Sequence, residues 1–342
     1  SIDQVRIYNA AVSAANVTAL YNEIECPAVA VTNAFNTVLY TGNGSTQSIT
    51  NVGFEPNLTW IKPRSQADNH NLFDTIRGVQ KQLISNNTSA ESTQPNTLTS
   101  FNSNGFSIGP DNNINTSAQT YVAWNWKAGG TAVSNTDGTI TSQVSANVDA
   151  GFSIVKYTGN GSTTATIGTG LNEKVELVLI KNIDQSTVWS AVQLLEQAVG
   201  NLNNSNAMTF SYYLGNTTSS VLGFTAQNNA WNQSSNNHIA YCFHSVAGYS
   251  KVGSYVGSDS TQLIVTNFRP AFVLIKTTSD EWWNIVDNKR NGTLTSRLYT
   301  NSSAAEGSFT NDVILNSNGF TVLGNNSSLN DAGRDFIFLA IA

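Results

Sequence analysis

Short apolar runs separated by residues that favour turns recur along the chain and predict β-strands. Segments 58–61, 175–180 and 272–275 are almost continuously apolar, as expected of strands that are buried on both faces. Asn43 and Gly44 favour a tight hairpin turn, because both residue types adopt positive φ angles readily. Within the strand-rich part of the chain, residues 188–199 are an exception whose pattern indicates a helix.

Four markers recur three times in the same order and define a repeat of roughly 95 residues. They are a Tyr-led turn (40–45, 157–162, 255–260), an Ile-Lys pair (61–62, 180–181, 275–276), a Gly-Phe pair (105–106, 223–224, 319–320) and a closing strand (121–126, 238–243, 336–341). The Lys and the Phe are separated by 44, 43 and 44 residues in the three copies. Spacing this regular indicates copies of one module. Serial modules more often provide reach or avidity than one active site.

The predicted fold is all-β, with three tandem β-sandwich-like repeats preceded by a strand-helix remnant. The expected boundaries are the end of another domain (1–24), a linker (25–36), repeat 1 (37–127), a linker (128–150), repeat 2 (151–245) and repeat 3 (249–342). Within the second linker, residues 135–138 read as the tip of a hairpin.

The amino-acid composition differs from that of an ordinary cytosolic enzyme. Charged residues are 11% of the 342, against an average near 25%. The polarity comes from 45 Asn and 75 Ser and Thr, which suits the turns of extracellular and virion β proteins. Seven Trp, fifteen Phe and eleven Tyr argue against disorder.

Charge and cysteine usage narrow the classes of partner. The net charge is −6 and the sixteen Lys and Arg are scattered, which argues against nucleic-acid binding. Apolar runs fall well short of the roughly 18–20 residues of a membrane span. Cys26 and Cys242 lie in unrelated contexts, which argues against a disulfide scaffold or a cysteine metal site. Ser1 in place of Met suggests a processed or partial chain.

The first 24 residues carry one resemblance. Ile2–Tyr8 reads as a strand and Ser13–Asn22 as a short helix, with Ser13 as its N-cap. The segment resembles the last strand and helix of LamG or concanavalin A-like lectin domains, which often end in a D-x-V-R-I-Y-N…L-Y-N pattern. The resemblance implies a jelly-roll lectin domain before Ser1.

The repeats carry a second resemblance, which covers essentially the whole chain. Its phrases are 124–130 (WNWKAGG), 137–142 (DGTITS), 150–155 (AGFSIV), 239–243 (IAYCF) and 268–276 (FRPAFVLIK). As a set they resemble a repeat of marine tailed-phage structural proteins, which often carry a LamG-like module upstream. The resemblance implies a virion component such as a tail fibre, spike or other appendage, and it brings no catalytic motif.

The charged residues and histidines that could take part in catalysis are better explained by structural roles. Asp74-x-x-Arg77 and Asp287-x-x-Arg290 occupy similar places in repeats 1 and 3 and are absent from repeat 2. Opposite charges three residues apart fit a local ion pair or turn better than the two carboxylates of a glycoside hydrolase. His70, His238 and His244 do not recur across the repeats. For His238 and His244 a surface or strand-edge position is expected.

The sequence offers candidate residues for binding a metal ion or a glycan. Segments 111–115 and 330–335 are rich in Asn and Asp, so Ca²⁺ is the one cofactor they suggest, although turn formation is the favoured reading. Trp231 lies among polar loop residues, and Trp282 and Trp283 are adjacent, so one of that pair is expected to face the core and the other outward. These three Trp are the candidate glycan-binding residues, since aromatic faces stack on sugar rings.

The sequence therefore predicts a non-enzymatic structural protein of a tailed phage with adhesion to host-surface glycans. Its expected partners are other virion proteins, host surface polysaccharide and, by resemblance to phage fibres, further copies in a homotrimer. A cell-surface adhesin or extracellular filament subunit is the alternative, since a repeated, low-charge β chain fits that class as well. A polysaccharide-degrading spike is the weaker one.

Overall fold

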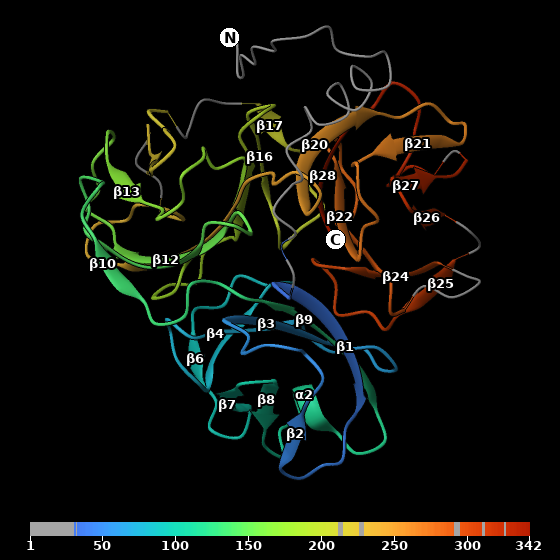
Figure 1. Ribbon diagram of the computed structural model, residues 1–342, viewed down its shortest axis with the longest axis horizontal. Coiled ribbons are helices and arrows are strands. Elements are labelled where there is room, and N and C mark those ends of the chain that lie inside the picture. The colour runs from blue at the N-terminus through green and yellow to red at the C-terminus, as the bar shows by residue number, and fades with distance from the viewer. Residues whose placement is uncertain are drawn as a thin grey trace, which may run out of the picture. The chain divides into compact units, whose positions relative to one another are not determined.

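The computed structural model describes residue 31 and residues 33–210, 215–225, 229–290, 295–309, 312–324 and 326–342. Residues from Val31 to the C-terminus form one compact unit. The expectations for residues 1–24, for most of the linker at 25–36 and for Cys26 lie outside the described residues. The described residues are almost entirely strands, which confirms the all-β prediction (Figure 1).

Module 1 is a sandwich of two antiparallel sheets, ordered β1-β9-β3-β4-β5-β6 and β2-β8-β7. Its elements are β1 (Phe35–Thr41), β2 (Gln47–Ile49), β3 (Leu58–Pro63), β4 (Asn71–Asp74), β5 (Lys81–Ile84), β6 (Ser92–Thr93), β7 (Leu98–Asn102), β8 (Gly105–Ile108), the short helix α2 (Asn112–Asn115) and β9 (Thr120–Trp126). The core between the two sheets is apolar and centred on Phe106 and Tyr121.

Module 2 has the same plan with a longer large sheet, ordered β10-β11-β12-β19-β14-β15-β16-β17, and a small sheet β13-β18. Its strands are β10 (Val133–Asn135), β11 (Ser142–Asn147), β12 (Phe152–Thr158), β13 (Thr166–Gly168), β14 (Leu177–Asn182), β15 (Ser190–Gln193), β16 (Ala198–Asn201), β17 (Thr209–Phe210), β18 (Val221–Gly223) and β19 (Asn237–Phe243).

Module 3 returns to the plan of module 1, with sheets ordered β20-β28-β22-β23-β24-β25 and β21-β27-β26. Its strands are β20 (Ser250–Val256), β21 (Gln262–Val265), β22 (Phe272–Thr277), β23 (Asn284–Asp287), β24 (Thr295–Tyr299), β25 (Gly307–Phe309), β26 (Val313–Asn316), β27 (Gly319–Val322) and β28 (Asp335–Ile341). The three-copy pattern of the sequence is thus a three-copy pattern of sandwiches.

The Tyr-led turn and the closing strand recur because they pair directly. Tyr40, Tyr157 and Tyr255 lie opposite Tyr121, His238 and Phe336, and each pair of rings stacks with centroids 4.9, 5.2 and 4.9 Å apart. Each Tyr hydroxyl also donates to the backbone carbonyl of a loop residue, Ile114, Trp231 or Leu329, at 2.5–2.8 Å. One side chain therefore holds a strand pair and a loop together.

The Gly-Phe marker also has a steric cause. A Cβ on Gly105, Gly223 or Gly319 would lie 2.0, 1.9 or 2.1 Å from a backbone carbonyl oxygen, closer than any real contact. The Phe that follows each glycine is fully buried between the two sheets of its module. Only glycine admits this close approach, so the pair is retained in each copy.

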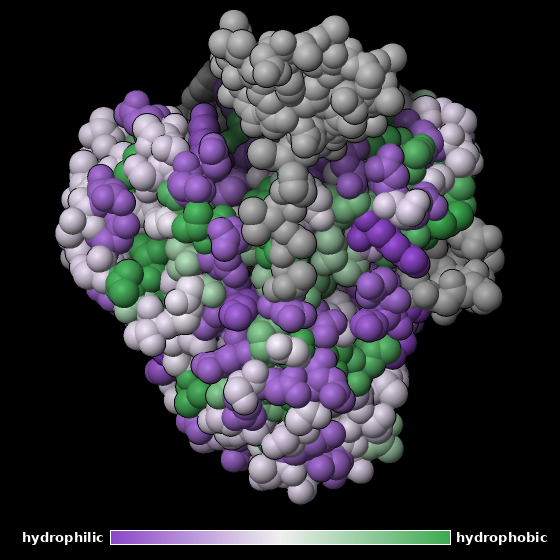
Figure 2. Space-filling model, in the orientation of Figure 1, coloured by the Kyte–Doolittle hydropathy of each residue, from purple (hydrophilic) through white to green (hydrophobic). Residues whose placement is uncertain are grey.

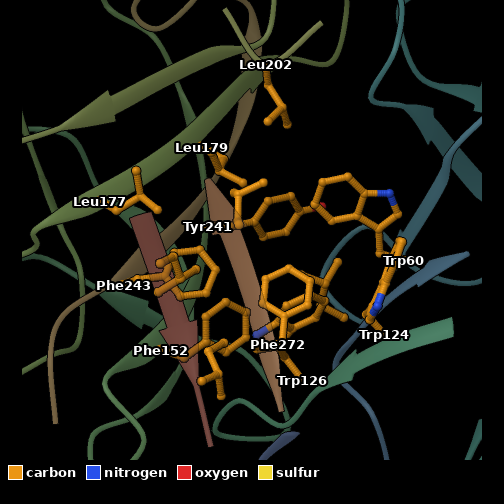
Figure 3. Packing of buried hydrophobic residues seen from close by; sticks show 14 of the residues in the cluster. Trp60, Trp124, Trp126, Phe152, Leu177, Leu179, Leu202, Tyr241, Phe243 and Phe272 are labelled. Atoms are coloured by element: carbon orange, nitrogen blue, oxygen red, sulfur yellow. The ribbon is translucent and has the colours of Figure 1, made fainter. Parts of the chain in front are cut away.

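The central strands of each large sheet are buried on both faces. One face packs on the small sheet of its own module, and the other faces a central apolar cluster to which all three modules contribute. Every residue of β3, β14 and β22 is buried, which explains the continuous apolar runs that predicted them. Figure 3 shows the cluster, with Trp60, Trp124, Tyr241 and Phe272 converging from different modules.

Aromatic rings fill the centre closely. Phe272 of module 3 lies 5.5 Å from Trp126 and 6.0 Å from Trp124 of module 1, both edge to face. The void among these side chains is only about 10 Å³ and its lining is apolar, so it is at the minimum for one water and offers a water no partners. In addition to the core within each module, the three modules therefore share a central apolar cluster, and they pack as one unit instead of as independent domains.

Two predictions of local structure need correction. Residues 128–150, expected to form a linker, carry β10 and β11, which extend the large sheet of module 2; the hairpin expected at 135–138 connects them. Residues 188–199 are not helical. They form β15 and the start of β16, because Ser190–Gln193 is buried on both faces and Gln197 turns the chain with a φ of 55°.

Candidate functional site

The modules close into a ring through equivalent contacts at three junctions. At each junction a backbone N–H of one module donates to the carbonyl two residues after the repeated lysine of the next. The three bonds are Glu91 N to Ile183 O (2.9 Å), Met208 N to Thr278 O (2.8 Å) and Glu306 N to Arg64 O (2.8 Å). They connect module 1 to 2, module 2 to 3 and module 3 back to 1, as a threefold arrangement requires.

A second contact recurs at the start of β4, β15 and β23, where His70, Trp189 and Trp283 occupy corresponding positions. The indole of Trp189 donates to Ile84 O of module 1 at 2.8 Å, and that of Trp283 donates to Asn201 O of module 2 at 3.0 Å. His70 faces module 3: burial, followed by the charge of Lys62, lowers its pKa well below the ordinary value, and the backbone of Tyr299 counteracts this shift.

The Asp-Arg pairs lie at these junctions. Tyr241 of module 2 donates its hydroxyl to Asp74 Oδ2 of module 1 at 2.8 Å, and Trp124 of module 1 donates its indole N–H to Asp287 Oδ2 of module 3 at 2.9 Å. Each carboxylate also pairs with the arginine three residues later, and all four charged side chains are fully buried. The prediction of local ion pairs is confirmed.

Module 2 lacks the charged pair, and its neighbour explains why. Gln193 and Glu196 stand where the other modules have Asp and Arg, and Gln193 Oε1 still accepts from Glu196 N at 2.7 Å, as Asp74 does from Arg77 N. Leu339 of module 3 corresponds to Tyr241 and Trp124 in strand register and has no donor to offer. A buried carboxylate without a donor is costly, so a neutral Gln at this buried position is the stable alternative.

At the junction of modules 1 and 2, burial and charge shift the pKa values of the two side chains that bond Asp74. Burial, and then the charge of Asp74, raises the pKa of Tyr241 well above its ordinary value, so its hydroxyl remains a donor. Burial lowers the pKa of Arg77, but Asp74, Tyr241 and Glu91 together raise it more, and the guanidinium stays charged. The carboxylates are thereby committed to holding the ring together and have no exposed face for a substrate.

The repeated lysines are anchors for the loops that reach the junctions. Lys62, Lys181 and Lys276 are fully buried, and each ammonium donates to a carbonyl of the following residue at 2.7 or 2.8 Å. Lys181 also reaches Thr88 O of module 1 at 3.3 Å. Burial is the first cause that lowers all three pKa values to about 8.

The other polar candidates are structural as well. His238 and His244 are buried at the two ends of β19, which is paired on both sides, so the expected surface or strand-edge positions are wrong; His238 stacks on Tyr157. Asn115 and Asn330, from the Asn- and Asp-rich segments, are buried and hold the Tyr-led turns by hydrogen bonds. Across the described ranges, no group of three or more His, Cys, Asp and Glu side chains could hold a metal ion.

The three candidate tryptophans differ strongly in solvent exposure. Trp231 is 2% exposed and corresponds to Ile114 and Leu329, so the expectation of an exposed ring is wrong: only its neighbours are polar. Trp283 is 1% exposed and packs at the junction of modules 2 and 3. Trp282 is 42% exposed, which confirms that the adjacent pair points in opposite directions. Neither buried ring offers a face to a sugar.

Trp282 belongs to a group of side chains that the sequence did not reveal. Its ring lies 5.4 Å from that of Tyr299. The Arg297 guanidinium carbon lies 5.8 Å from the centre of the same Tyr299 ring, and Arg297 Nη2 pairs with Asp312 Oδ2 at 3.0 Å. Tyr299 pairs with Asn284 across β23 and β24, so only the hairpin register brings it beside Trp282. We call Trp282, Tyr299 and the adjacent Glu281 the Trp282 platform.

Fold and site together define the class: an all-β protein whose three sandwich modules form a closed ring with an exposed aromatic platform on module 3. The chain belongs to the family described as Domain of unknown function (DUF7483), whose model matches residues 30–342. No curated protein matches it significantly.

A solved structure, the major capsid protein P2 from Bacteriophage PM2, is 10% identical and aligns over 54% of this chain and 94% of that chain with a TM-score of 0.17. A score this low carries no argument about fold or function. Among the described residues, no helix is long and apolar enough to cross a membrane.

Proposed function

We propose that this chain is a non-enzymatic structural component of a tailed-phage virion, in a tail fibre or another appendage, that contacts host-surface glycans. The closed ring is the observation that supports a structural role. Its repeated polar groups serve turns and junctions: the two Asp-Arg pairs, the three lysines and the three turn asparagines are all buried.

The outer surface suits contact with neutral, hydroxyl-rich partners. Figure 2 shows polar and apolar residues intermingled on one face of the molecule, and the chain as a whole carries few charges. Surfaces of amides, hydroxyls and occasional aromatic rings bind sugars through hydrogen bonds and stacking. Trp282 is the aromatic side chain that supports this part of the proposal.

The virion role rests on the resemblance of the repeat phrases to tailed-phage structural proteins, and imaging tests it. Antibodies raised against the purified chain should label the tail or another appendage of the phage that encodes it, as seen by immunoelectron microscopy. Label confined to a cell envelope or to extracellular filaments would instead support the adhesin alternative and overturn the virion role.

Two biochemical assays test the remaining parts. The purified chain should bind at least one class of host-surface polysaccharide on a glycan array, and failure on every glycan would remove adhesion while leaving the structural role. Incubation with host polysaccharide should release no reducing ends above a heat-denatured control. Sustained release would make the chain a depolymerase.

A further inference from the structure

The Trp282 platform exists in module 3 alone. Strand register places Asn69 of module 1 and Val188 of module 2 at the position of Trp282, and Ile84 and Asn201 at that of Tyr299. A framework requirement would have kept the aromatic pair in every copy, as it kept the Tyr-led turns. The pair is therefore a property of one outer surface.

The loop that carries Trp282 is fixed before any ligand arrives. Glu281 N donates to Ser205 O of module 2 at 2.8 Å, and Asp280 accepts from Ala207 N at 2.6 Å. On the other side of Trp282, the buried indole of Trp283 is bonded to Asn201 O. A rigid, half-exposed indole loses little conformational entropy when a ring stacks on it.

Charge around the platform has one sign at the surface. Asp280 is exposed, Glu281 is half-buried and the Asp312 side chain is 18% exposed. The cations are withdrawn: Arg297 is 3% exposed and paired with Asp312, and Lys276 is fully buried. A ligand at the indole therefore meets carboxylates that accept hydrogen bonds and repel negative charge.

We infer that the Trp282 platform binds neutral or amine-bearing pyranosides and discriminates against uronic acids and other anionic sugars. The apolar face of the ring stacks on Trp282, its hydroxyls donate to Glu281, and an ammonium substituent gains from the carboxylates and the indole face. This inference rests on the proposed glycan contact and specifies which glycans take part.

The test uses three β-1,4-linked tetrasaccharides that share one backbone and differ in one substituent per ring and hence in charge: cellotetraose, the glucosamine tetramer and the glucuronic acid tetramer. Titration of the full chain, followed by ligand-observed NMR, should show binding of the neutral and amine-bearing tetramers at least about tenfold tighter than the acidic one. Added salt should weaken binding of the amine-bearing tetramer and leave cellotetraose unchanged.

Substitutions at Trp282 and Glu281 test whether these two residues cause the selectivity between neutral and acidic sugars. Trp282→Ala should reduce binding of cellotetraose at least about tenfold, whereas Leu263→Ala, which trims a 50% exposed apolar side chain on β21 of the same module, should not change it. Glu281→Gln should raise binding of the acidic tetramer relative to cellotetraose. Stability of each variant is checked by thermal unfolding.

Several results would overturn the inference: equal or tighter binding of the acidic tetramer, binding that survives Trp282→Ala, or no binding of any tetramer. None of them changes the labelling of virions, and a glycan-array signal that persists in Trp282→Ala would keep the adhesion while moving it elsewhere. Failure of the ligand class is thereby distinguishable from failure of the proposed function.

Discussion

Tyr241→Phe removes one atom from the junction between modules 1 and 2 and so measures what the ring closure contributes. The lost hydroxyl donates at 2.8 Å to a fully buried carboxylate, that of Asp74. Hydrogen bonds to charged groups contribute about 1.5–3 kcal/mol, and Asp74 keeps its bonds to Arg77 and to the Ile76 backbone, so the loss is bounded. We expect the free energy of unfolding to fall by about 2 kcal/mol.

A matched control exists within the same module. Tyr157→Phe also deletes a buried hydroxyl, but that hydroxyl donates at 2.5 Å to a backbone carbonyl inside module 2. A bond between neutral groups contributes about 0.5–1.5 kcal/mol, so this variant should cost less than Tyr241→Phe. Urea unfolding followed by tryptophan fluorescence and far-UV circular dichroism measures both, with the m-value checked for constancy.

The double-mutant cycle of Tyr241→Phe with Asp74→Asn isolates the contact itself. Because the two side chains touch, their effects should be non-additive by about 1 kcal/mol or more, whereas Tyr157→Phe and Asp74→Asn should add. Equal costs for the two Tyr→Phe variants, together with additivity in the cycle, would refute the assignment of Tyr241 to a strong junction contact.

Three further predictions concern the junctions, the turns and pH. Gln193→Met should cost only about 1 kcal/mol, because Nε2 of Gln193 has no partner among the described residues and the bond lost is the one from Glu196 N to Oε1, whereas Asp74→Leu should cost about 3–5 kcal/mol by leaving the buried Arg77 with Glu91 at 3.3 Å as its remaining counter-charge, as urea titration can show. Gly42→Ala would bring a Cβ to 2.2 Å from a backbone carbonyl oxygen and should prevent folding or cost more than about 3 kcal/mol in thermal unfolding, while Gly53→Ala meets no atom within 4 Å and should cost about 1–2 kcal/mol for its φ of 91°. The three buried lysines have pKa values lowered to about 8, so between pH 8 and about 9 the unfolded chain holds more protons than the folded one and the urea midpoint should rise with pH. Above this window the buried tyrosines, whose pKa values burial raises, oppose the rise. A flat or falling midpoint between pH 8 and about 9 would contradict the burial of the ammonium groups.

The strands and their grouping into three sandwiches were predictable because their causes are local in the sequence. Turn residues, apolar periodicity and the spacing of markers act within one repeat, and each marker corresponds to a contact inside its own module. Gly105 and Tyr40 show this well: one meets a carbonyl of the neighbouring strand and the other stacks on the closing strand. Contacts within one module therefore produce patterns that can be recognised in the sequence.

Ring closure was not predictable, because its contacts join residues far apart in the chain. Trp124 and Asp287 are 163 positions apart, and Tyr241 and Asp74 are 167 apart. A continuously apolar strand predicts that both of its faces are buried, but it does not identify which part of the chain packs on the second face. The Asp-Arg pairs were recognised as ion pairs from their spacing, while their donors from the next module carry no local signal.

The candidate site was only partly predictable for a related reason. Polar neighbours suggested that Trp231 was exposed, but Asn232 beside it is itself buried, where it holds a turn. Alignment of the loops before Asn115, Asn232 and Asn330 would have placed Trp231 with two apolar residues and indicated burial. Trp282 was assigned outward by alternation alone, and Tyr299 came to it through hairpin register.

Covalent fusion of the ring has a consequence for how such a surface can change. In a ring of three identical chains, any substitution appears three times, so a residue that improves one face must be tolerated at all three positions. Here each sector is encoded separately, so one junction can lack the buried Asp-Arg pair and one sector can carry an aromatic pair while the others keep their own residues. Assembly of this ring is also unimolecular, so it does not weaken on dilution as a three-chain ring does.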